Sequence, residues 1–290
     1  MTTLKTFFLH TTFLVFFITV TTFAQNDSIK KELYTAHNKG KFFGHMGGNR
    51  AYYTTSDLHF TGEGYNFTVE NAQSHDLPKG WNIDYITPGK LTTSQTNWKI
   101  GYFFHDKFNI SIGVDHMKYV MTQDQTAMIN GTINLPASMP GSASNGTYHN
   151  EPVDLTDGKF LKFEHTNGLN YIFTEAAYYT DISSIFGIRN TDIFQLNLTE
   201  GVGVGILVPR TDSTVLQQQR HDEFHISGYG FSADAGLNFT FFKHFYAQTE
   251  IKAGYINMTD VRTTYTNDHA QHHFWYGETI ISFGAIYRLF

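Results

Sequence analysis

The chain has 290 residues, a formal net charge of −6 and no cysteine. The absence of cysteine excludes disulfides, a thiol nucleophile, a cysteine-based metal site and a lipid-modified cysteine. The mildly acidic balance argues against nucleic acid as a partner, because nucleic-acid-binding proteins normally present a basic patch.

Residues 1–24 have the pattern of a secretory signal peptide. Lys5 supplies the positive charge, Phe7 to Val20 an apolar core, and Thr22-Phe23-Ala24 a cleavage site. A membrane anchor is the alternative, but this core is short and threonine-rich for a span of roughly 20 residues. No other segment is apolar enough for a helical span. A membrane protein without such a helix must be a closed barrel, because lipid offers no partners to unpaired backbone groups.

The stretch from Phe224 to Asp260 shows most clearly how the chain is built. From His225 to Phe241, apolar and aromatic residues alternate with small and polar ones, which is the period of a strand with two different faces. The apolar run spans about 30 Å at roughly 3.3 Å per residue, about twice the length of a usual soluble strand. The alternation therefore predicts a strand that crosses a membrane, with lipid on one side and a polar lumen on the other.

The rest of the chain repeats this pattern after a short periplasmic lead, residues 25–40. The expected strands are Lys41–Thr55, Gln95–Phe104, Phe108–Met121, Lys159–Thr180, Thr191–Val208, the two arms of a hairpin that turns at Phe242-Lys243-His244, and His273–Phe290. Their connections alternate between long and short, and Asp57–Phe60 and Tyr65–Val69 are expected to extend neighbouring strands above the membrane. Residues 41–290 are thus predicted to form an all-β, eight-stranded, antiparallel, up-and-down transmembrane barrel with periplasmic termini, in which the inserts 56–93 and 122–158 are long extracellular loops.

This pattern resembles the small eight-stranded outer-membrane barrels of Gram-negative bacteria over essentially the whole mature chain, and its aromatic- and asparagine-rich texture looks like that of barrels from the Bacteroidota. The resemblance implies location in the outer membrane, contact with outer-membrane lipid, and recognition by the barrel-assembly machinery through the last strand, which ends in Phe290. In this chain Phe290 is out of phase with the lipid-facing Tyr287 and Leu289. Arg288 stands where the family pattern has an apolar residue.

Strict alternation places charged residues on the inner face of the barrel. They are Lys99, Asp115, Asp234, Glu250, Lys252, Glu278 and Arg288, and Glu175 is expected to join them. An eight-stranded barrel is just wide enough for side chains to fill it, so we expect opposite charges to pair and plug the lumen. A narrow pore for solutes or metal ions is the alternative. Glu200 is anomalous, because the same alternation puts it on the lipid face.

Histidine is abundant, with 15 residues, and two groups end the third and fourth external loops. They are His221 and His225 in the first group, and His269, His272 and His273 in the second. Imidazole and carboxylate groups suit zinc, copper or iron. A divalent metal site at the outer rim is therefore an open alternative to a protein that has no cofactor and ordinary interfacial histidines.

A third constellation surrounds Glu164-His165-Thr166-Asn167, which is loosely similar to the His-x-Ser-Asn signature of outer-membrane lipid A 3-O-deacylases. The resemblance implies ester hydrolysis with His165 as general base, Thr166 as nucleophile and Glu175 as the orienting acid. The spacing is one residue short and the serine is missing, so we assign no catalytic residue. We expect a structural or binding protein that meets a ligand or external partner through its outer loops, with a lipid A acyl hydrolase and a narrow pore as alternatives.

Overall fold

The computed structural model describes residues 37–78, 80, 95–220, 224–264 and 267–289. The predicted signal peptide 1–24, most of the predicted lead 25–40 and Phe290 lie outside these residues. The described chain is mainly antiparallel strand, with two short 3₁₀ segments, η3 (Ser142–Ser144) and η4 (Ser183–Phe186). No helix in this part of the chain is long and apolar enough to cross a membrane.

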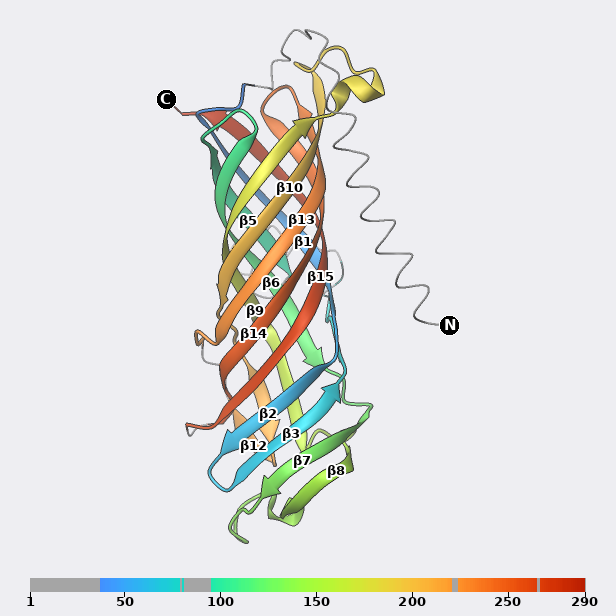
Figure 1. Ribbon diagram of the computed structural model, residues 1–290, viewed down its shortest axis with the longest axis vertical. Helices are drawn as coiled ribbons and strands as arrows, with labels where there is room; N and C mark the ends of the chain where they lie inside the picture. Colours follow the sequence, from blue (N-terminus) through green and yellow to red (C-terminus); the bar gives the residue numbers. More distant parts are fainter. Residues whose placement is uncertain (1–36, 79, 81–94, 221–223, 265–266, 290) are drawn as a thin grey trace. The chain divides into compact units, whose positions relative to one another are not determined.

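Eight long strands form a ring of hydrogen-bonded neighbours (Figure 1). In ring order they are β1 (Lys41–Tyr53), β5 (Thr96–Phe103), β6 (Phe108–Met121), β9 (Leu161–Asp181), β10 (Phe194–Leu207), β13 (Gly228–Phe241), β14 (Phe245–Arg262) and β15 (His269–Arg288). Every neighbouring pair is antiparallel, and β15 pairs back onto β1 from Lys41 opposite Arg288 to Tyr53 opposite Tyr276. The prediction of an eight-stranded, up-and-down antiparallel barrel is confirmed. β6 has the predicted bounds, whereas β15 begins four residues earlier than predicted.

The two faces of these strands differ as the alternation predicts. On β6, Phe108, Ile110 and Ile112 are exposed, whereas Asn109 and Ser111 between them are buried. The same contrast holds around the ring, so large apolar side chains form a broad band on its outer surface. Monomeric soluble proteins rarely expose apolar patches larger than a few hundred Å², and such a band is the lipid-facing surface of a transmembrane barrel.

The two ends of the ring have different connections. At the end where β1 begins and β15 ends, called here the terminal end, β5 joins β6 through residues 104–107 and β13 joins β14 through residues 242–244. The connection between β9 and β10 at this end carries η4. At the opposite end, called here the distal end, residues 54–95, 122–160 and 208–227 make three long connections. The fourth distal connection, residues 263–268 between β14 and β15, is shorter than residues 182–193 between β9 and β10, so the predicted alternation of loop lengths holds at every connection except these two.

The described parts of the long inserts are mostly ordered sheet. The ring's sheet continues from β15 onto β2 (Ser56–Gly62), β3 (Tyr65–Ala72), β7 (Thr126–Ile133) and β8 (Gly146–Asp154), in that order. A short β4 (Ser74–His75) pairs with β6, and the hairpin of β11 (Asp212–Val215) and β12 (Gln218–Arg220) pairs with β9. The expected strand extensions at 57–60 and 65–69 are therefore confirmed, while the pairing of β7 with β8 was not foreseen. These distal strands are together called the extension.

A hydrophobic core joins the extension to the distal end of the ring. Phe60 and Phe67 are fully buried, with ring centroids 5.3 Å apart, and Phe60 meets Phe163 of β9 edge-on at 5.5 Å. Gly131 lets β7 approach β3 here, because its φ is +126° and a Cβ would lie 2.3 Å from the carbonyl oxygen of Asn66. The core continues from the extension into the distal part of the barrel, between β9, β14 and β15.

Closure of the ring can be tested with cysteines, since the natural chain has none. Met46 of β1 lies opposite Phe283 of β15, and both side chains point outward. Directly opposed Cβ atoms are about 4.5–5.5 Å apart, so Met46→Cys with Phe283→Cys should form a disulfide on mild oxidation. Met46→Cys with Leu289→Cys, about 20 Å further along the strand, should not. Non-reducing gels of the boiled protein report the closed loop, and equal cross-linking of both pairs would contradict the register.

Candidate functional site

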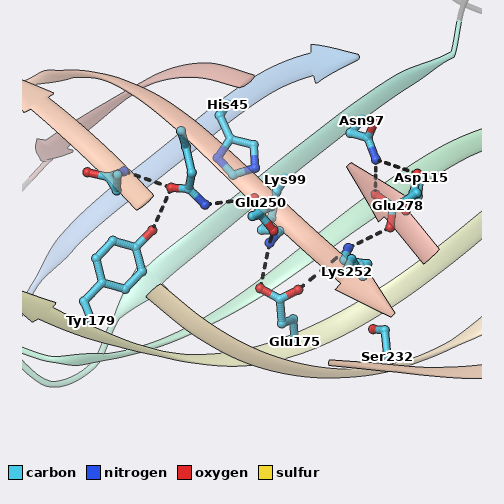
Figure 2. A network of polar contacts seen from close by, with 12 residues as sticks. His45, Asn97, Lys99, Asp115, Glu175, Tyr179, Ser232, Glu250, Lys252 and Glu278 are labelled. Atoms are coloured by element: carbon cyan, nitrogen blue, oxygen red, sulfur yellow. Dashed lines mark hydrogen bonds and ion pairs between the residues drawn. The ribbon is translucent and has the colours of Figure 1, made fainter. Parts of the chain in front are cut away.

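Two buried lysines organise the middle of the lumen (Figure 2). Lys99 Nζ lies 2.7 Å from Glu175 Oε1 and 3.2 Å from Glu250 Oε1. Lys252 Nζ lies 2.7 Å from Asp115 Oδ2 and 4.0 Å from Glu175 Oε2. These residues come from β5, β6, β9 and β14, so the ion pairs link strands that are not neighbours in the ring. These ion pairs connect opposite parts of the barrel wall across the lumen.

Two amide side chains add hydrogen bonds to this network. Asn97 Nδ2 donates to Asp115 Oδ1 at 2.5 Å and lies 3.4 Å from Glu278 Oε1. Gln248 Nε2 donates to Glu250 Oε2 at 2.8 Å. Sequence reasoning did not single out these amides, although each has the inward parity of the charged residue two positions away. Such hydrogen bonds compensate part of the cost of burying charge.

Carboxylates outnumber lysines in this network. Among the described residues, Asp234 and Glu278 are buried and make no ion pair, whereas Asp115, Glu175 and Glu250 each meet a lysine. Asp234 lies against the backbone of β10, where a Cβ at position 201 would come within 2.6 Å of its Oδ2. The glycine at that position therefore provides the room for a buried carboxylate.

Arg288 was predicted to lie inside the barrel, and this prediction is wrong. Its parity is inward, but it lies at the terminal end, where it is exposed and its Nη2 donates to the carbonyl oxygen of Lys39 at 2.7 Å. Glu200 lies on the outer face, half-buried, opposite Tyr178 and Ala235 in an unbroken register. No bulge in β10 turns Glu200 inward, so its lipid-side position follows from the strand itself.

The proposed hydrolase residues do not form one site. His165 points inward and is fully buried, with its Nδ1 3.0 Å from Thr211 Oγ1. Thr166 points to the other face and donates to Glu164 Oε1 at 3.0 Å. Glu175 lies ten residues further along β9, roughly 30 Å away at about 3.3 Å per residue, where it pairs with Lys99. The interpretation of these three residues as a catalytic triad is wrong, because alternate residues of a strand face opposite sides.

The rim histidines do not all converge on one site. His221 lies outside the described residues, and His273 points outward beside Tyr255, with ring centroids 6.0 Å apart. His225 Nε2 and His269 Nδ1 lie 2.7 and 2.5 Å from the two oxygens of Asp260. Within the described ranges, no three His, Asp or Glu side chains are placed to hold a metal ion. The predicted rim site is therefore not formed by its described members.

His272 points inward, away from the other rim histidines. It is 3% exposed, and its Nε2 lies 3.5 Å from Nε2 of the fully buried His165. Both lie beyond Ile172 and Trp275, the outermost exposed apolar residues of β9 and β15. Burial lowers the pKa of His165 to about 3 and that of His272 well below its ordinary value. Both rings are therefore neutral near pH 7.

A closed ring of antiparallel strands, apolar outside and filled with paired charges inside, is the architecture of a transmembrane barrel. The chain folds as an eight-stranded transmembrane β-barrel. No protein-family model and no curated protein sequence matches this barrel.

Three solved structures illustrate what the barrel is similar to. Neisserial surface protein A is 10% identical at a TM-score of 0.37, over 85% of this chain and 97% of that one. Ail of Yersinia pestis is 10% identical at 0.31, over 86% and 99%. The outer membrane protein AlkL is 12% identical at 0.41, over 91% and 97%. At these TM-scores the likeness adds nothing to the strand pairing, which defines the fold by itself.

The lysine bridges of the barrel should respond strongly to removal of one partner. Lys252→Met leaves the carboxylate of Asp115 buried without its cation, which should lower the free energy of unfolding by about 3–5 kcal/mol. Lys252→Met with Asp115→Asn should recover most of this loss. Lys162→Met removes an ion pair with Asp212 that is partly exposed to solvent, so it should cost less than about 1 kcal/mol. Guanidinium unfolding in detergent measures all three, and equal losses for both single variants would contradict a bracing role.

Proposed function

We propose that this protein is a closed, non-porin barrel of the outer membrane that presents its extension outside the cell as a binding surface. The observation that carries the proposal is a pair of rows of neutral, hydrogen-bonding side chains on the outer face of the extension, beside the carboxylates of Glu70 and Asp260. The short connections at the terminal end support the orientation, because outer-membrane barrels keep short turns in the periplasm and long connections outside.

Three features of the lumen support a closed barrel. The lysine network fills its middle, and the aromatic core closes its distal mouth. A cavity at the terminal end, between Phe103, Tyr179 and Tyr246, holds only about 20 Å³. A water molecule needs about 10–15 Å³, so this cavity admits one or two waters and no solute.

The outer face of the extension carries two rows of neutral polar side chains that cross five strands. One row is Gln271, His59, Thr68, Asn130 and His149, and the next is His269, Thr61, Asn66, Thr132 and Thr147, each in the strand order β15, β2, β3, β7 and β8. All are exposed or half-exposed. Four strand spacings of roughly 4.8 Å make each row about 19 Å long, which is enough for an extended ligand.

Hydrogen bonds hold parts of this face in a fixed arrangement. His59 Nδ1 lies 2.9 Å from Thr68 Oγ1, and its Nε2 lies 3.2 Å from Thr61 Oγ1. Toward the lipid-facing band the face ends at Trp275, which is 62% exposed and has its ring 5.2 Å from that of Tyr255. Exposed aromatic rings next to neutral donors and acceptors suit a saccharide, which offers both apolar ring faces and hydroxyl groups. We therefore infer that the ligand is an uncharged saccharide.

A panel of neutral, phosphorylated and sulfated oligosaccharides tests the ligand class with the purified protein in detergent. Thr68→Arg places a long cation in the middle of the face and should weaken neutral-saccharide binding at least tenfold. The matched control Thr156→Arg adds the same charge at an exposed position off the face and should bind as wild type does. The proposal fails if wild type binds no neutral saccharide, or if both variants lose binding equally.

Planar-bilayer recordings test the closed lumen separately. Because the lysine bridges and the distal core leave no continuous aqueous path, wild type should show no stable conductance steps. A 16-stranded general porin, whose lumen is an aqueous channel, is the positive control. Large steady steps from the purified protein would make the pore interpretation the correct one.

A further inference from the structure

His165 and His272 meet across the distal mouth of the barrel, although β9 and β15 are separated in the ring by β10, β13 and β14. Aromatic rings enclose the pair. Tyr119 and Phe163 each lie against both imidazoles, with centroid distances between 5.0 and 5.7 Å, and Phe274 lies 5.1 Å from His272. Two polar rings are thus buried among aromatic ones, at the cost of removing their nitrogens from water.

The hydrogen bonds of the pair do not supply that reason. A neutral imidazole has one donor nitrogen and one acceptor nitrogen. His165 uses its Nδ1 toward Thr211, but Nδ1 of His272 has no partner among the described residues. The two Nε2 atoms are 3.5 Å apart, longer than the roughly 2.7–3.2 Å of a good N–H hydrogen bond. Burying a polar group without a partner is unfavourable, because the group loses its hydrogen bonds to water.

The same distance fits two ligands of one metal ion. Imidazole nitrogens bind metals at about 2.0 Å, so a trigonal ion places two of them roughly 3.5 Å apart. Met258 lies directly opposite His272 in the pairing of β14 with β15, has the same inward parity, and is fully buried. Its thioether is the soft donor nearest to the pair in the strand register. We propose that His165 and His272 bind one Cu(I) ion through their facing Nε2 atoms, with Met258 as the third ligand.

The chemistry of the surroundings selects a soft monovalent ion. Imidazole and thioether donors favour Cu(I), whereas carboxylates and water favour hard divalent ions. The described walls of this site offer no carboxylate, so a doubly charged ion would be buried without anionic ligands, at a high cost. Thr211 accepts from Nδ1 of His165 in the bound form and fixes the ring, as partners of metal-bound histidines usually do.

Anaerobic titration of the folded, detergent-solubilised protein with Cu(I), against a chromogenic Cu(I) chelator, tests the site. Wild type should bind one ion per chain, and Ag(I), a redox-inert probe, should compete for it. His165→Phe and His272→Phe should each weaken binding at least 100-fold, and Met258→Leu about tenfold. The double variant His225→Ala with His269→Ala removes two rim imidazoles and is the matched control, which should bind as wild type does at pH 7.5 and pH 5.5.

Folding is checked for each variant by its shift on gels with and without boiling. If a phenylalanine variant does not fold, X-ray absorption of the copper-loaded wild type decides, with two nitrogen ligands and one sulfur ligand expected. The inference is wrong if wild type binds no stoichiometric Cu(I), if His272→Phe keeps full affinity, or if the rim double variant loses the ion. A coordination shell without sulfur removes Met258 from the site and overturns the proposed ligand set. None of these outcomes depends on whether the outer face of the extension binds saccharide.

Discussion

The pairing of β15 with β1 is the constraint on which the rest of the structure depends. Lipid supplies no hydrogen bonds, so a sheet that crosses a membrane must have no free edge. Thirteen residue pairs between β1 and β15 meet that requirement by joining the first strand of the ring to the last. With only eight strands the ring is narrow, and its interior must then be filled by side chains. Closure therefore determines both the apolar outer band and the crowded polar lumen.

The crowded lumen places charge where few waters can reach it. Lys99 and Lys252 each meet two carboxylates from other strands. Amides from β5 and β14 donate to the second oxygens of Asp115 and Glu250. Buried ion pairs of this kind contribute little net stability compared with apolar packing, but breaking one is costly. The network therefore specifies one arrangement of the strands more than it strengthens the barrel. Gly201 of β10 leaves room for the buried carboxylate of Asp234.

Most of the ring could be predicted from the sequence because lipid and lumen demand opposite side chains on alternate positions. That rule indicates the side of a strand but not its length or its neighbours. Arg288 has inward parity yet lies at the end of the ring, where the lumen opens. β8 was missed because nearly all of its side chains are exposed and it is held by its pairing with β7. The meeting of His165 with His272 depends on the register of five consecutive strands of the ring, which no local pattern contains.

The junction between β1 and β2 has a mechanical consequence. After β1 ends, the amide of Thr54 donates to the carbonyl of Trp275, Ser56 Oγ donates to the carbonyl of His273, and β2 then pairs with β15 up to residue 269. One edge of β15 thus carries first the wall of the barrel and then the extension. A force applied to the extension is transmitted along β15. The hydrogen bonds that pair β15 with β1 and β2 then bear this force together in shear, and do not break one after another. The hydrogen bonds that join β1 and β2 to β15 therefore resist shear along the strand direction.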